Sequence, residues 1–535
     1  MIVSKFLCIS NCLNEQLIKC FILGFCLVPI SLFAGANKSK NNKYDRDTTV
    51  LRGSAYELAG VRFKKDSLFT PEQMREDVLF FYDKVFKTHP NPYHIISKDS
   101  LDKKIENILT SLYQPMNRRE FWVKLATLNA CFDVHTEILK IGEIYDYFWI
   151  NSKPHISRNL SNNIIMSDSF GNLYFNHEYG DSLLAGKHIK SVNGIPTKEI
   201  ANQISTYYSH ENTNILPQRF ASHFFLLFPH LFGSVDSFRF EYIKNDNEID
   251  VRTFYPKDAS KDTVPPIQAK QQINDRDIWA GKNFVRFNLY EEYSIAIIEL
   301  NNFSPTNLGE NFRKDLEAIM DTVVKKNIKH LFIDISANGG GGDHCAVEIL
   351  NFVKTKKKKY YSANAETKIS PAYREFIGRM HGENPPLSVK LSKYYRRVFK
   401  PDIGSIVNDN YYLTKDNSTI QYNQNVYLIQ STMATYSAST TLASLVKAYK
   451  FGIIIGEETG GLTSCYTNSL SFAMPNTAIP FMCATKRVTD VGGAMDGRGV
   501  LPDVEYKIGN PSKSFTLEQL KEMLQLVERY KGEVQ

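Results

Sequence analysis

A serine-rich turn between two short apolar segments is the part of the chain best suited to chemistry. Residues 425–430 and 453–455 are apolar and β-prone, and the spacing of apolar residues from Ser437 onward predicts a helix between them. A serine at a strand-to-helix turn exposes its hydroxyl beside the free N–H groups of the first helical turn. This placement predicts a nucleophile, although Ser437 and Ser439 can also be read as simple helix caps.

Three serines compete for the role of nucleophile. Ser431 directly follows the predicted strand but stands six residues before the helical pattern, far from the N–H groups that open the helix. Ser439 falls two residues inside the helix, where a hydroxyl can bond back to a carbonyl and is less free to attack. Ser437 alone occupies the turn, and we predict that it is the nucleophile.

A serine hydroxyl needs a base, and His135 is the candidate. It lies just beyond a predicted helix over 117–130 and at the mouth of a predicted strand over 131–139. A lone histidine in such a place is more often structural or exposed. Its assignment as a base therefore depends on the motifs described below.

A run of four glycines in residues 338–343 follows a predicted strand and opens a predicted helix over 344–353. A phosphate loop occupies such a place, but the Gly-Lys-Ser/Thr of a P-loop and the G-x-G-x-x-G spacing are both absent. Glycines also allow bare backbone N–H groups to approach a substrate carbonyl, or they simply form a tight turn. A nucleotide-binding scaffold stays open as an alternative.

Composition indicates a multidomain globular protein with no nucleic-acid partner. The 535 residues suffice for two to four domains, and 43% hydrophobic and 23% charged residues are ordinary for a chain with a buried core. A formal net charge of +7 is too small over this length to favour nucleic-acid binding.

The N-terminus predicts export. An apolar run over 20–33 follows Lys19 and precedes Ala34-Gly35-Ala36, a small-residue cleavage pattern. We expect a signal peptide over 1–36, cleavage after Ala36, and a secreted or periplasmic mature chain without a membrane span. An uncleaved membrane anchor is the alternative.

The cysteines argue against a zinc site. Cys131, Cys345, Cys465 and Cys483 remain after removal of the signal peptide, and none forms a CxxC pair. We expect no metal and no cofactor. Disulfides are compatible with an oxidising compartment, but their pairing does not follow from the sequence.

The mature chain divides into five predicted segments, one of which carries an insertion. They are a flexible lead-in (37–64), a helical region ending in the His135 strand (65–144), a small β-rich module (145–256), a polar linker (257–283) and a large α/β domain (284–535). Within the large domain, a strand over 294–300, a helix over 308–326 and a strand over 330–335 form a βαβ unit, which predicts a parallel pair. Residues 354–424 read as an insertion, either a solvated face or a lid.

Four ordered motifs in this chain resemble the C-terminal-processing (tail-specific) serine peptidases. The family's D-x-R-x-N-x-G-G matches residues 334–341, with Ser336 in place of arginine, and S-A-S-E matches 437–440, with Thr440 in place of glutamate. G-E-x-T-x-G matches 456–461 and G-V-x-P-D matches 499–503. Residues 133–136, Asp-Val-His-Thr, are similar to the D-G-H-T of the branch that uses a histidine.

The resemblance implies a fold and a set of site residues. The implied fold is a crotonase-like ββα peptidase core with a helical N-terminal region and a PDZ-like module. The tail-specific branch has its lysine base 25 residues beyond the nucleophile, where this chain has Leu462. The tricorn-like branch instead implies His135 as base and Asp496 as its acidic partner, with the N–H groups of Gly340 and Ala438 as the oxyanion hole.

We therefore expect a serine endopeptidase that acts on peptides or proteins through an acyl-enzyme. A catalytically inactive binding protein on the same fold is the main alternative, because Ser336 and Thr440 depart from the family pattern. The sequence specifies neither the substrate nor the oligomeric state.

Overall fold

The computed structural model of the chain describes most residues beyond the N-terminus. The ranges described are 46–60, 67–145, 165–167, 172–175, 183–211, 216–233, 235–245, 248–254, 285–303, 305–346, 348–353, 359–382, 385–414, 418–493, 497–509 and 513–534. The predicted signal peptide and most of the linker over 257–283 lie outside these ranges. Among the described helices, none combines the length and the apolar character needed to cross a membrane.

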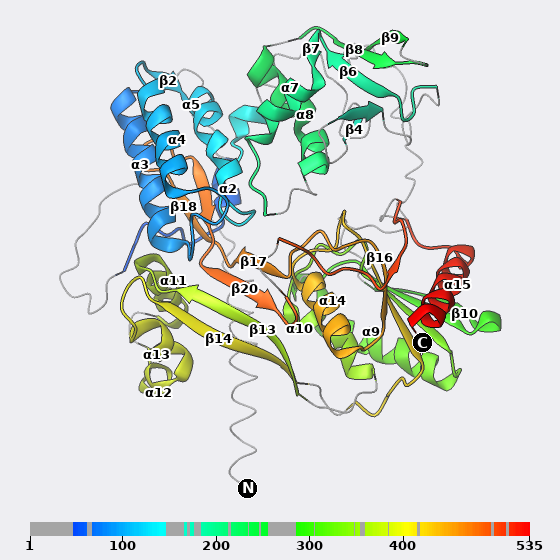
Figure 1. Cartoon of the computed structure of the whole chain (residues 1–535). Helices are drawn as coiled ribbons and strands as arrows, with labels where there is room; N and C mark the ends of the chain where they lie inside the picture. The colour runs from blue at the N-terminus through cyan, green and yellow to red at the C-terminus, as the bar shows by residue number, and fades with distance from the viewer. Residues whose placement is uncertain are drawn as a thin grey trace, which may run out of the picture. The chain divides into compact units, whose positions relative to one another are not determined.

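A six-stranded sheet carries the large α/β domain (Figure 1). Its order is β10-β11-β12-β15-β16-β21, and every neighbouring pair is parallel except β10 with β11. The strands are β10 (Val285–Tyr290), β11 (Ile295–Leu300), β12 (His330–Asp334), β15 (Asn425–Gln430), β16 (Ile453–Gly456) and β21 (Val504–Glu505). The βαβ unit is confirmed, because helix α9 (Pro305–Lys325) connects the parallel pair β11 and β12.

Helices cover both faces of this sheet because its central strands are apolar throughout. In β11, Ala296, Ile298 and Leu300 enter one buried cluster with residues of α9 and of α14 (Ala438–Tyr449). Ile295 and Ile297 enter a second cluster with residues of α15 (Leu517–Val534). Parallel strands buried on both sides read as continuous apolar runs, as these do.

The segment over 354–424 contributes two strands to a second sheet of order β14-β13-β20-β17. Strands β13 (Lys359–Lys368) and β14 (Ile406–Thr414) form an antiparallel hairpin, and β13 also pairs with β20 (Lys486–Asp490), which pairs with β17 (Ser464–Thr467). Helices α11 (Pro371–His381), α12 (Leu387–Leu391) and α13 (Lys393–Phe399) lie between β13 and β14 in sequence. The segment is thus built into the sheet, and its role as a lid stays a prediction.

The N-terminal region is helical, as predicted, and is joined to the rest by a small sheet. Its main helices are α3 (Pro71–Thr88), α4 (Lys98–Ser111) and α5 (Arg118–Leu125), followed by a 3₁₀ turn over Ala126–Cys131. A capping box at Thr70 and a proline at the first helical position start α3. Strand β3 (Glu137–Ile138) pairs with β19 (Pro480–Cys483), which pairs with β18 (Leu470–Ala473).

A further antiparallel sheet forms within the predicted β-rich module, in the order β4-β5-β6-β8-β9 with β7 beside β6. The strands are β4 (Ile165–Ser167), β5 (Leu173–Phe175), β6 (His188–Val192), β7 (Ile195–Pro196), β8 (Phe238–Ile243) and β9 (Ile249–Phe254), and helix α7 (Thr197–Ser205) follows β7. The module also contains helix α8 (Leu216–Phe232), which the pattern of apolar residues did not predict. Its aromatic-rich sequence, with Pro229 inside, masks its periodicity.

Two further predictions differ from the structure near the site. The helix predicted over 344–353 is interrupted, with α10 over Asp343–Ala346 and a 3₁₀ turn over Glu348–Phe352. The strand predicted over 131–139 shortens to β3, because the Asp133 side chain closes a turn around His135. The mixed α/β class is confirmed, while the crotonase-like core and the PDZ-like module stay predictions.

Candidate active site

Ser437 occupies a strained turn at the start of α14. It is the residue before the first helical residue, with φ 52° and ψ −124°, and its side chain makes no capping hydrogen bond. A non-glycine residue with positive φ costs on the order of 1–3 kcal/mol and occurs most often at functional sites. The Ser437 side chain is exposed, so its hydroxyl is free to meet a substrate.

The two competing serines are buried. The Ser431 hydroxyl donates to the carbonyl of Ser336 at 2.5 Å and accepts from the N–H of Ala434 at 3.1 Å, so it stabilises the turn. The Ser439 hydroxyl is fully buried. The expected bond from Ser439 back to a carbonyl is not formed, since its Oγ has no hydrogen-bond partner. The burial of both serines leaves Ser437 as the accessible hydroxyl of this turn.

The glycine loop packs directly against the serine turn. Gly340 has φ 101°, and a Cβ atom added to it would lie 2.7 Å from the carbonyl oxygen of Tyr436 and 3.1 Å from the amide nitrogen of Ala438. The Tyr436 N–H donates to the carbonyl of Asn338 at 3.3 Å, which ties the two turns together. This close approach requires glycine at position 340.

Of the two predicted oxyanion donors, the N–H of Gly340 is hydrogen-bonded within the part of the chain that the structure describes and the N–H of Ala438 is not. The N–H of Gly340 donates to Oδ1 of Asn338 at 2.9 Å, so this donor is already occupied in the structure, and its role as an oxyanion donor stays a prediction. The N–H of Ala438 makes no hydrogen bond within the described residues and lies beside Gly340. The next N–H in the loop, that of Gly341, also makes no hydrogen bond within the described residues. The backbone of Phe303 pairs with the residues on either side of it: the Phe303 N–H donates to the carbonyl of Gly340, and the Phe303 carbonyl accepts the N–H of Gly342.

In the Asp-Val-His-Thr motif of residues 133–136, the aspartate and the threonine hold the backbone around the histidine. Oδ1 of Asp133 accepts the His135 N–H at 2.9 Å, and the carbonyl of Asp133 accepts the Thr136 N–H at 3.0 Å. The Thr136 hydroxyl accepts the N–H of Ala484 at 3.1 Å, and the Ser469 hydroxyl donates to the His135 carbonyl at 2.8 Å. The aspartate and the threonine thus fix the backbone and leave the His135 ring free for another task.

The environment of the His135 imidazole favours its neutral form. Burial lowers its pKa below the ordinary value, although the negative charge of Asp133 acts in the opposite direction. Its Nδ1 is buried and has no hydrogen-bond partner among the described residues, and the Tyr466 backbone lies beside the ring. A neutral imidazole can accept a proton, so the group is in its basic form near neutral pH.

One short segment connects the serine turn with the histidine turn. At its start, Gly461 donates its N–H to Thr435 at 2.9 Å, and a Cβ atom on Gly461 would lie 3.1 Å from the amide nitrogen of Ser437. Five residues later, Tyr466 lies against His135. Five residues span at most about 18 Å, so both turns belong to one neighbourhood. No hydrogen bond joins Ser437 to His135 among the described contacts.

The remaining predicted positions fall as follows. Leu462, which stands where the tail-specific branch has its lysine, is buried and apolar. Nζ of Lys486 in β20 lies 3.5 Å from the hydroxyl of Tyr411. Asp496 lies outside the described residues.

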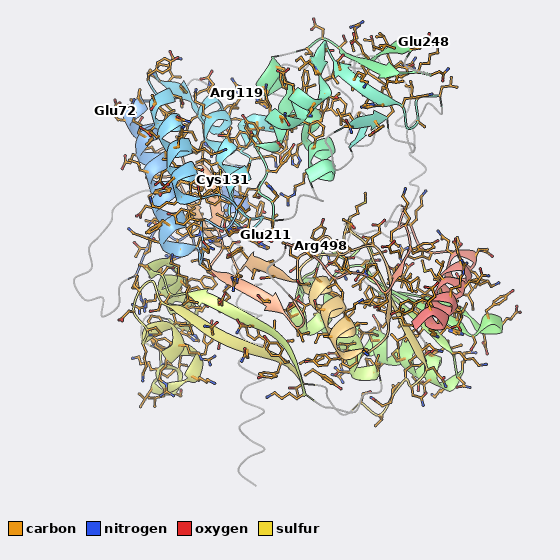
Figure 2. All side chains as sticks on the ribbon, in the orientation of Figure 1. Glu72, Arg119, Cys131, Glu211, Glu248 and Arg498 are labelled. Atoms are coloured by element: carbon orange, nitrogen blue, oxygen red, sulfur yellow. The ribbon has the colours of Figure 1, made fainter. Side chains whose placement is uncertain are left out.

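Several residues that no sequence pattern singled out lie around Asp133. Nε2 of His89 lies 2.8 Å from Oδ2 of the fully buried Asp133, and the rings of His94 and Tyr466 pack beside it. Burial lowers the pKa of His94 to about 4. Glu211, labelled in Figure 2, accepts the Tyr466 N–H at 2.7 Å, and burial together with the charge of Asp133 raises its pKa well above its ordinary value. No motif links these positions in sequence.

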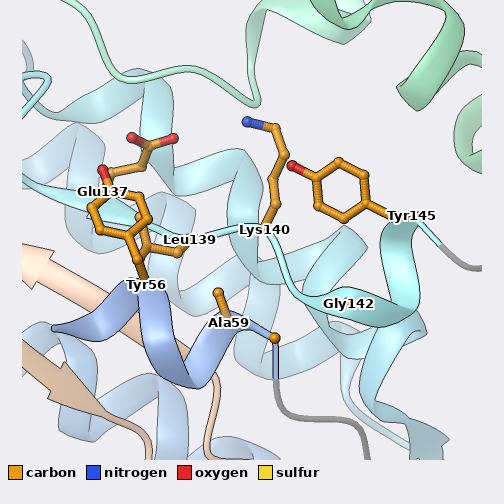
Figure 3. Close-up of a pocket in the computed structure, with 8 residues that line it drawn as sticks. Tyr56, Ala59, Glu137, Leu139, Lys140, Gly142 and Tyr145 are labelled. Atoms are coloured by element: carbon orange, nitrogen blue, oxygen red, sulfur yellow. The ribbon is translucent and has the colours of Figure 1, made fainter. Parts of the chain in front are cut away.

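A pocket of about 400 Å³ adjoins the strand that follows His135 (Figure 3). Glu137, Leu139 and Lys140 line it together with Tyr56 and Tyr145, and Figure 3 shows the Tyr145 hydroxyl pointing toward the Lys140 side chain. Burial lowers the pKa of Lys140, an effect that the charge of Glu137 opposes. The pocket offers polar and aromatic groups close to His135 in sequence.

The family model for Peptidase family S41 matches residues 294–506, which include Gly340, Ser437 and Ala438. No curated protein was similar enough in sequence to count as a match.

The solved structures similar to this chain include mature CPAF in complex with lactacystin, with a TM-score of 0.52 and 13% identity over 81% of this chain and 93% of that one. Mature CPAF alone gives a TM-score of 0.52 and 12% identity over 81% and 92%. The photosystem II D1 C-terminal processing protease gives 0.40 and 16% over 81% and 93%. At these identities, the similarity to CPAF shows a shared fold. Residues 294–506 therefore match peptidase family S41, and the predicted resemblance to the C-terminal-processing serine peptidases is confirmed.

Proposed function

We propose that this protein hydrolyses peptide bonds with Ser437 as nucleophile and His135 as general base. The observation that carries the proposal is the exposed Ser437 side chain, held at positive φ at the first turn of α14, with no hydrogen bond to any residue that the structure describes. A hydroxyl held in this way is poorly explained as a cap or a packing group. It is well explained as a group that attacks a carbonyl.

The chemistry follows the usual order for a serine peptidase. Oγ of Ser437 forms a bond with the scissile carbonyl carbon while its proton passes to His135. The C–N bond then breaks, the leaving amine takes the proton from His135, and an ester on Ser437 remains. Water, deprotonated by His135, attacks the ester carbonyl carbon, the bond to Oγ of Ser437 breaks, and Oγ takes the proton back from His135 as the acid is released. No step requires a metal or a cofactor.

The negative oxygen formed in this reaction needs two N–H donors. Ala438 supplies one from the first turn of α14. The second comes from the glycine loop, either from Gly341 or from Gly340 after its bond to Asn338 has been exchanged for one to the substrate. Hydrogen bonds in active sites often align only when substrate is bound, so the present Gly340 bond is compatible with this role.

His135 also needs a partner that fixes its tautomer. By the family pattern, Asp496 takes this role. The partner has to reach Nδ1 of His135, which has no hydrogen bond at present, if Nε2 is to face Ser437.

The glycine loop gives no support to the nucleotide-binding alternative. A phosphate loop requires several free N–H groups that converge on one anion. Here Gly340 and Gly342 already donate to Asn338 and Phe303, and Gly340 is packed against Ser437.

Labelling with a serine-directed phosphonate tests the proposal. We expect one covalent adduct per chain, mapped by mass spectrometry to Ser437, and none in Ser437→Ala. Ser439→Ala is the matched control and should label normally, because its hydroxyl is buried. A folded wild-type chain that stays unlabelled and retains an apolar ligand would favour the binding-protein alternative.

A further inference from the structure

The helical part of the 354–424 segment has a surface that the proposed function leaves unexplained. The structure describes residues 385–414 without a gap. Within them, residues 385–401 contain five basic residues and no acidic one, although the whole chain holds 64 basic and 57 acidic residues. Exposed apolar side chains gather in the same place, since six of the twenty-one large ones in the described chain lie between Met380 and Ile406. Uniform charge combined with exposed apolar side chains points to a partner.

Helix α13 turns its cationic side chains away from the protein. Tyr395, Val398 and Phe399 are buried and form the inner face of this helix. At about 3.6 residues per turn, the basic residues of α13 and the one that ends it fall on the opposite face. Together with Pro401 they line one open hollow of about 340 Å³; they are Lys393, Arg396, Arg397 and Lys400. Four cations therefore surround one site on the surface.

Most of these positive charges have no counter-charge. Arg397 forms an ion pair with Asp409 of β14. Lys393, Arg396 and Lys400 are exposed and form no ion pair with any residue that the structure describes. Cations held around one hollow repel one another, so an anion that binds there would lower the electrostatic energy. The hollow is thus suited to anionic groups such as phosphates.

Helix α12 places two leucines beside these cations. Leu387 is 69% exposed and Leu391 is 55% exposed. They stand four residues apart, so they share one face of the helix. Helices α12 and α13 contact each other (Figure 1), and only Ser392 separates them, whose side chain accepts the Tyr395 N–H and caps α13. The leucines and the cations therefore belong to neighbouring parts of one surface.

We propose that α12 and α13 dock the protein on an anionic lipid membrane, with the cations of α13 at the headgroup phosphates and the leucines of α12 between the lipids. A free phosphate or a nucleic acid would occupy the cationic hollow but would leave the leucines in water. An apolar partner would cover the leucines but would leave the cations without counter-charge. The interface of an anionic bilayer offers phosphates and apolar chains within about 10 Å of each other, so it satisfies both.

The docking should be reversible and sensitive to salt. Each lysine or arginine close to an anionic membrane contributes about fivefold to partitioning, so three unpaired cations contribute on the order of 100-fold. The inserted leucines add an apolar contribution that salt does not screen. Docking involves neither Ser437 nor His135, so this inference goes beyond the proposed function and is independent of it.

Co-sedimentation of the exported chain with lipid vesicles tests the proposal. We expect the chain to sediment with vesicles made of equal parts of phosphatidylglycerol and phosphatidylcholine, and to stay in solution with phosphatidylcholine alone. Raising the salt concentration from about 0.1 M to about 1 M shortens the Debye length from about 10 Å to about 3 Å and should release most of the bound protein.

Two double variants separate the cationic contribution from the apolar one. Lys393→Glu/Arg396→Glu should weaken binding by about 25-fold or more, because two contributions of about fivefold are lost and two repulsive charges are added. Leu387→Ser/Leu391→Ser should weaken binding by about tenfold or more and keep the salt dependence, because only the inserted apolar surface is lost.

Lys103→Glu/Lys104→Glu is the matched control for the charge reversal. Both lysines are exposed in α4, and their replacement changes the net charge by the same amount. This control should bind vesicles like the wild type. Circular dichroism establishes that each variant folds, and Lys393→Gln/Arg396→Gln replaces the charge reversal if that variant does not.

The proposal is overturned if the wild type does not bind anionic vesicles, if it binds phosphatidylcholine vesicles equally well, or if Lys393→Glu/Arg396→Glu binds as tightly as the wild type. An equal loss in the Lys103→Glu/Lys104→Glu control would show that only net charge matters, and would also overturn it. A titration with poly-glutamate addresses the other class of partner. A chain that binds this peptide and not the vesicles docks an acidic protein, which refutes membrane docking.

Discussion

A Cβ atom on Gly340 would lie 2.7 Å from the Cβ atom of Ser437. The glycine loop after β12 and the turn before α14 therefore touch through the one side chain we assign as nucleophile. The loop comes from the first half of the core and the turn from the second. Their contact places a backbone rich in N–H groups beside the Ser437 hydroxyl.

Gly340→Ala should abolish most activity, whereas Gly339→Ala should be tolerated. Alanine at 340 meets the serine turn and also requires φ 101°, a strain on the order of 1–3 kcal/mol. A displaced oxyanion donor typically costs about 10²–10³ in rate. Gly339 is exposed, and a Cβ atom there meets nothing within 4 Å. Measured kcat values for both variants, with circular dichroism to establish folding, decide the matter. Equal activities would contradict the packing argument.

Ser437→Ala, His135→Ala and the double variant should lose similar amounts of activity. Residues that act as one unit are strongly non-additive, so the second substitution adds little to the first. The measurement is kcat/KM on an unstructured protein substrate for all three variants. A double variant that loses the product of both single losses would mean that the two residues act independently.

Lys486→Ala is the companion variant for the histidine assignment. Lys486 lies nearest in sequence to the family's lysine position, and its ammonium group faces Tyr411. We expect near-normal activity. If Lys486→Ala were inactive while His135→Ala remained active, a rearranged Ser–Lys pair would replace the proposed one.

The pH dependence of kcat/KM should report a base with a pKa below 6.5. Burial disfavours the protonated form of His135, so activity is retained as pH falls until this lowered pKa is reached, and is lost below it. Asp490, whose pKa burial raises to about 7, is a second titrating group in the core. The acidic limb of the profile should therefore be unchanged in Asp490→Asn. A midpoint near 7 that moves in this variant would assign the limb to Asp490.

Export can be tested on the N-terminus itself. The Ala34-Gly35-Ala36 pattern predicts that the mature chain begins at Asn37. Amino-terminal sequencing of exported protein should return Asn-Lys-Ser-Lys. Ala36→Leu should block cleavage, because signal peptidases require a small residue before the cut. Exported protein that still begins at Met1 would refute the prediction.

The central strands and the helices next to them were predictable because their patterns are strong. β11, β15 and α14 lie within a few residues of their predicted positions, because a short continuous apolar run indicates a buried strand and apolar residues at helical spacing indicate a helix. The 131–139 segment was not predictable, because one carboxylate, Asp133, converts an alternating sequence into a turn. In that case a side chain competes successfully with the strand.

The position of Ser437 at a strand-to-helix turn could be predicted from the sequence, but its surroundings could not. Ser437 occupies a turn between two recognisable elements, so local patterns locate it. The cluster of His89, His94 and Asp133 depends on how two distant segments pack, and nothing in the spacing of these residues signals it. The hydrogen bond that occupies the Gly340 N–H likewise arises from loop geometry that motifs do not encode.

Asp490→Asn should stabilise the protein at neutral pH and have little effect near pH 4. Burial, reinforced by the charge of Asp343, raises the pKa of Asp490 to about 7, against 3.8 when exposed. Between these values the folded chain holds a proton that the unfolded chain has lost, so the free energy of unfolding falls as pH rises from 4 to 7. Asparagine removes this pH dependence of stability. Its side-chain oxygen can still accept the hydrogen bond that the Thr441 hydroxyl donates to Asp490 at 3.0 Å in the wild type.

The free energies of unfolding of the wild type and Asp490→Asn should thus differ by up to a few kcal/mol at pH 7 and become equal at pH 4, because each unit of pKa shift corresponds to about 1.4 kcal/mol. Urea unfolding at both pH values measures the difference. Asp402→Asn, at an exposed position, is the control and should follow the wild type at both. A difference that is the same at pH 4 and pH 7 would show that the substitution acts through packing and that the buried carboxyl does not titrate in this range.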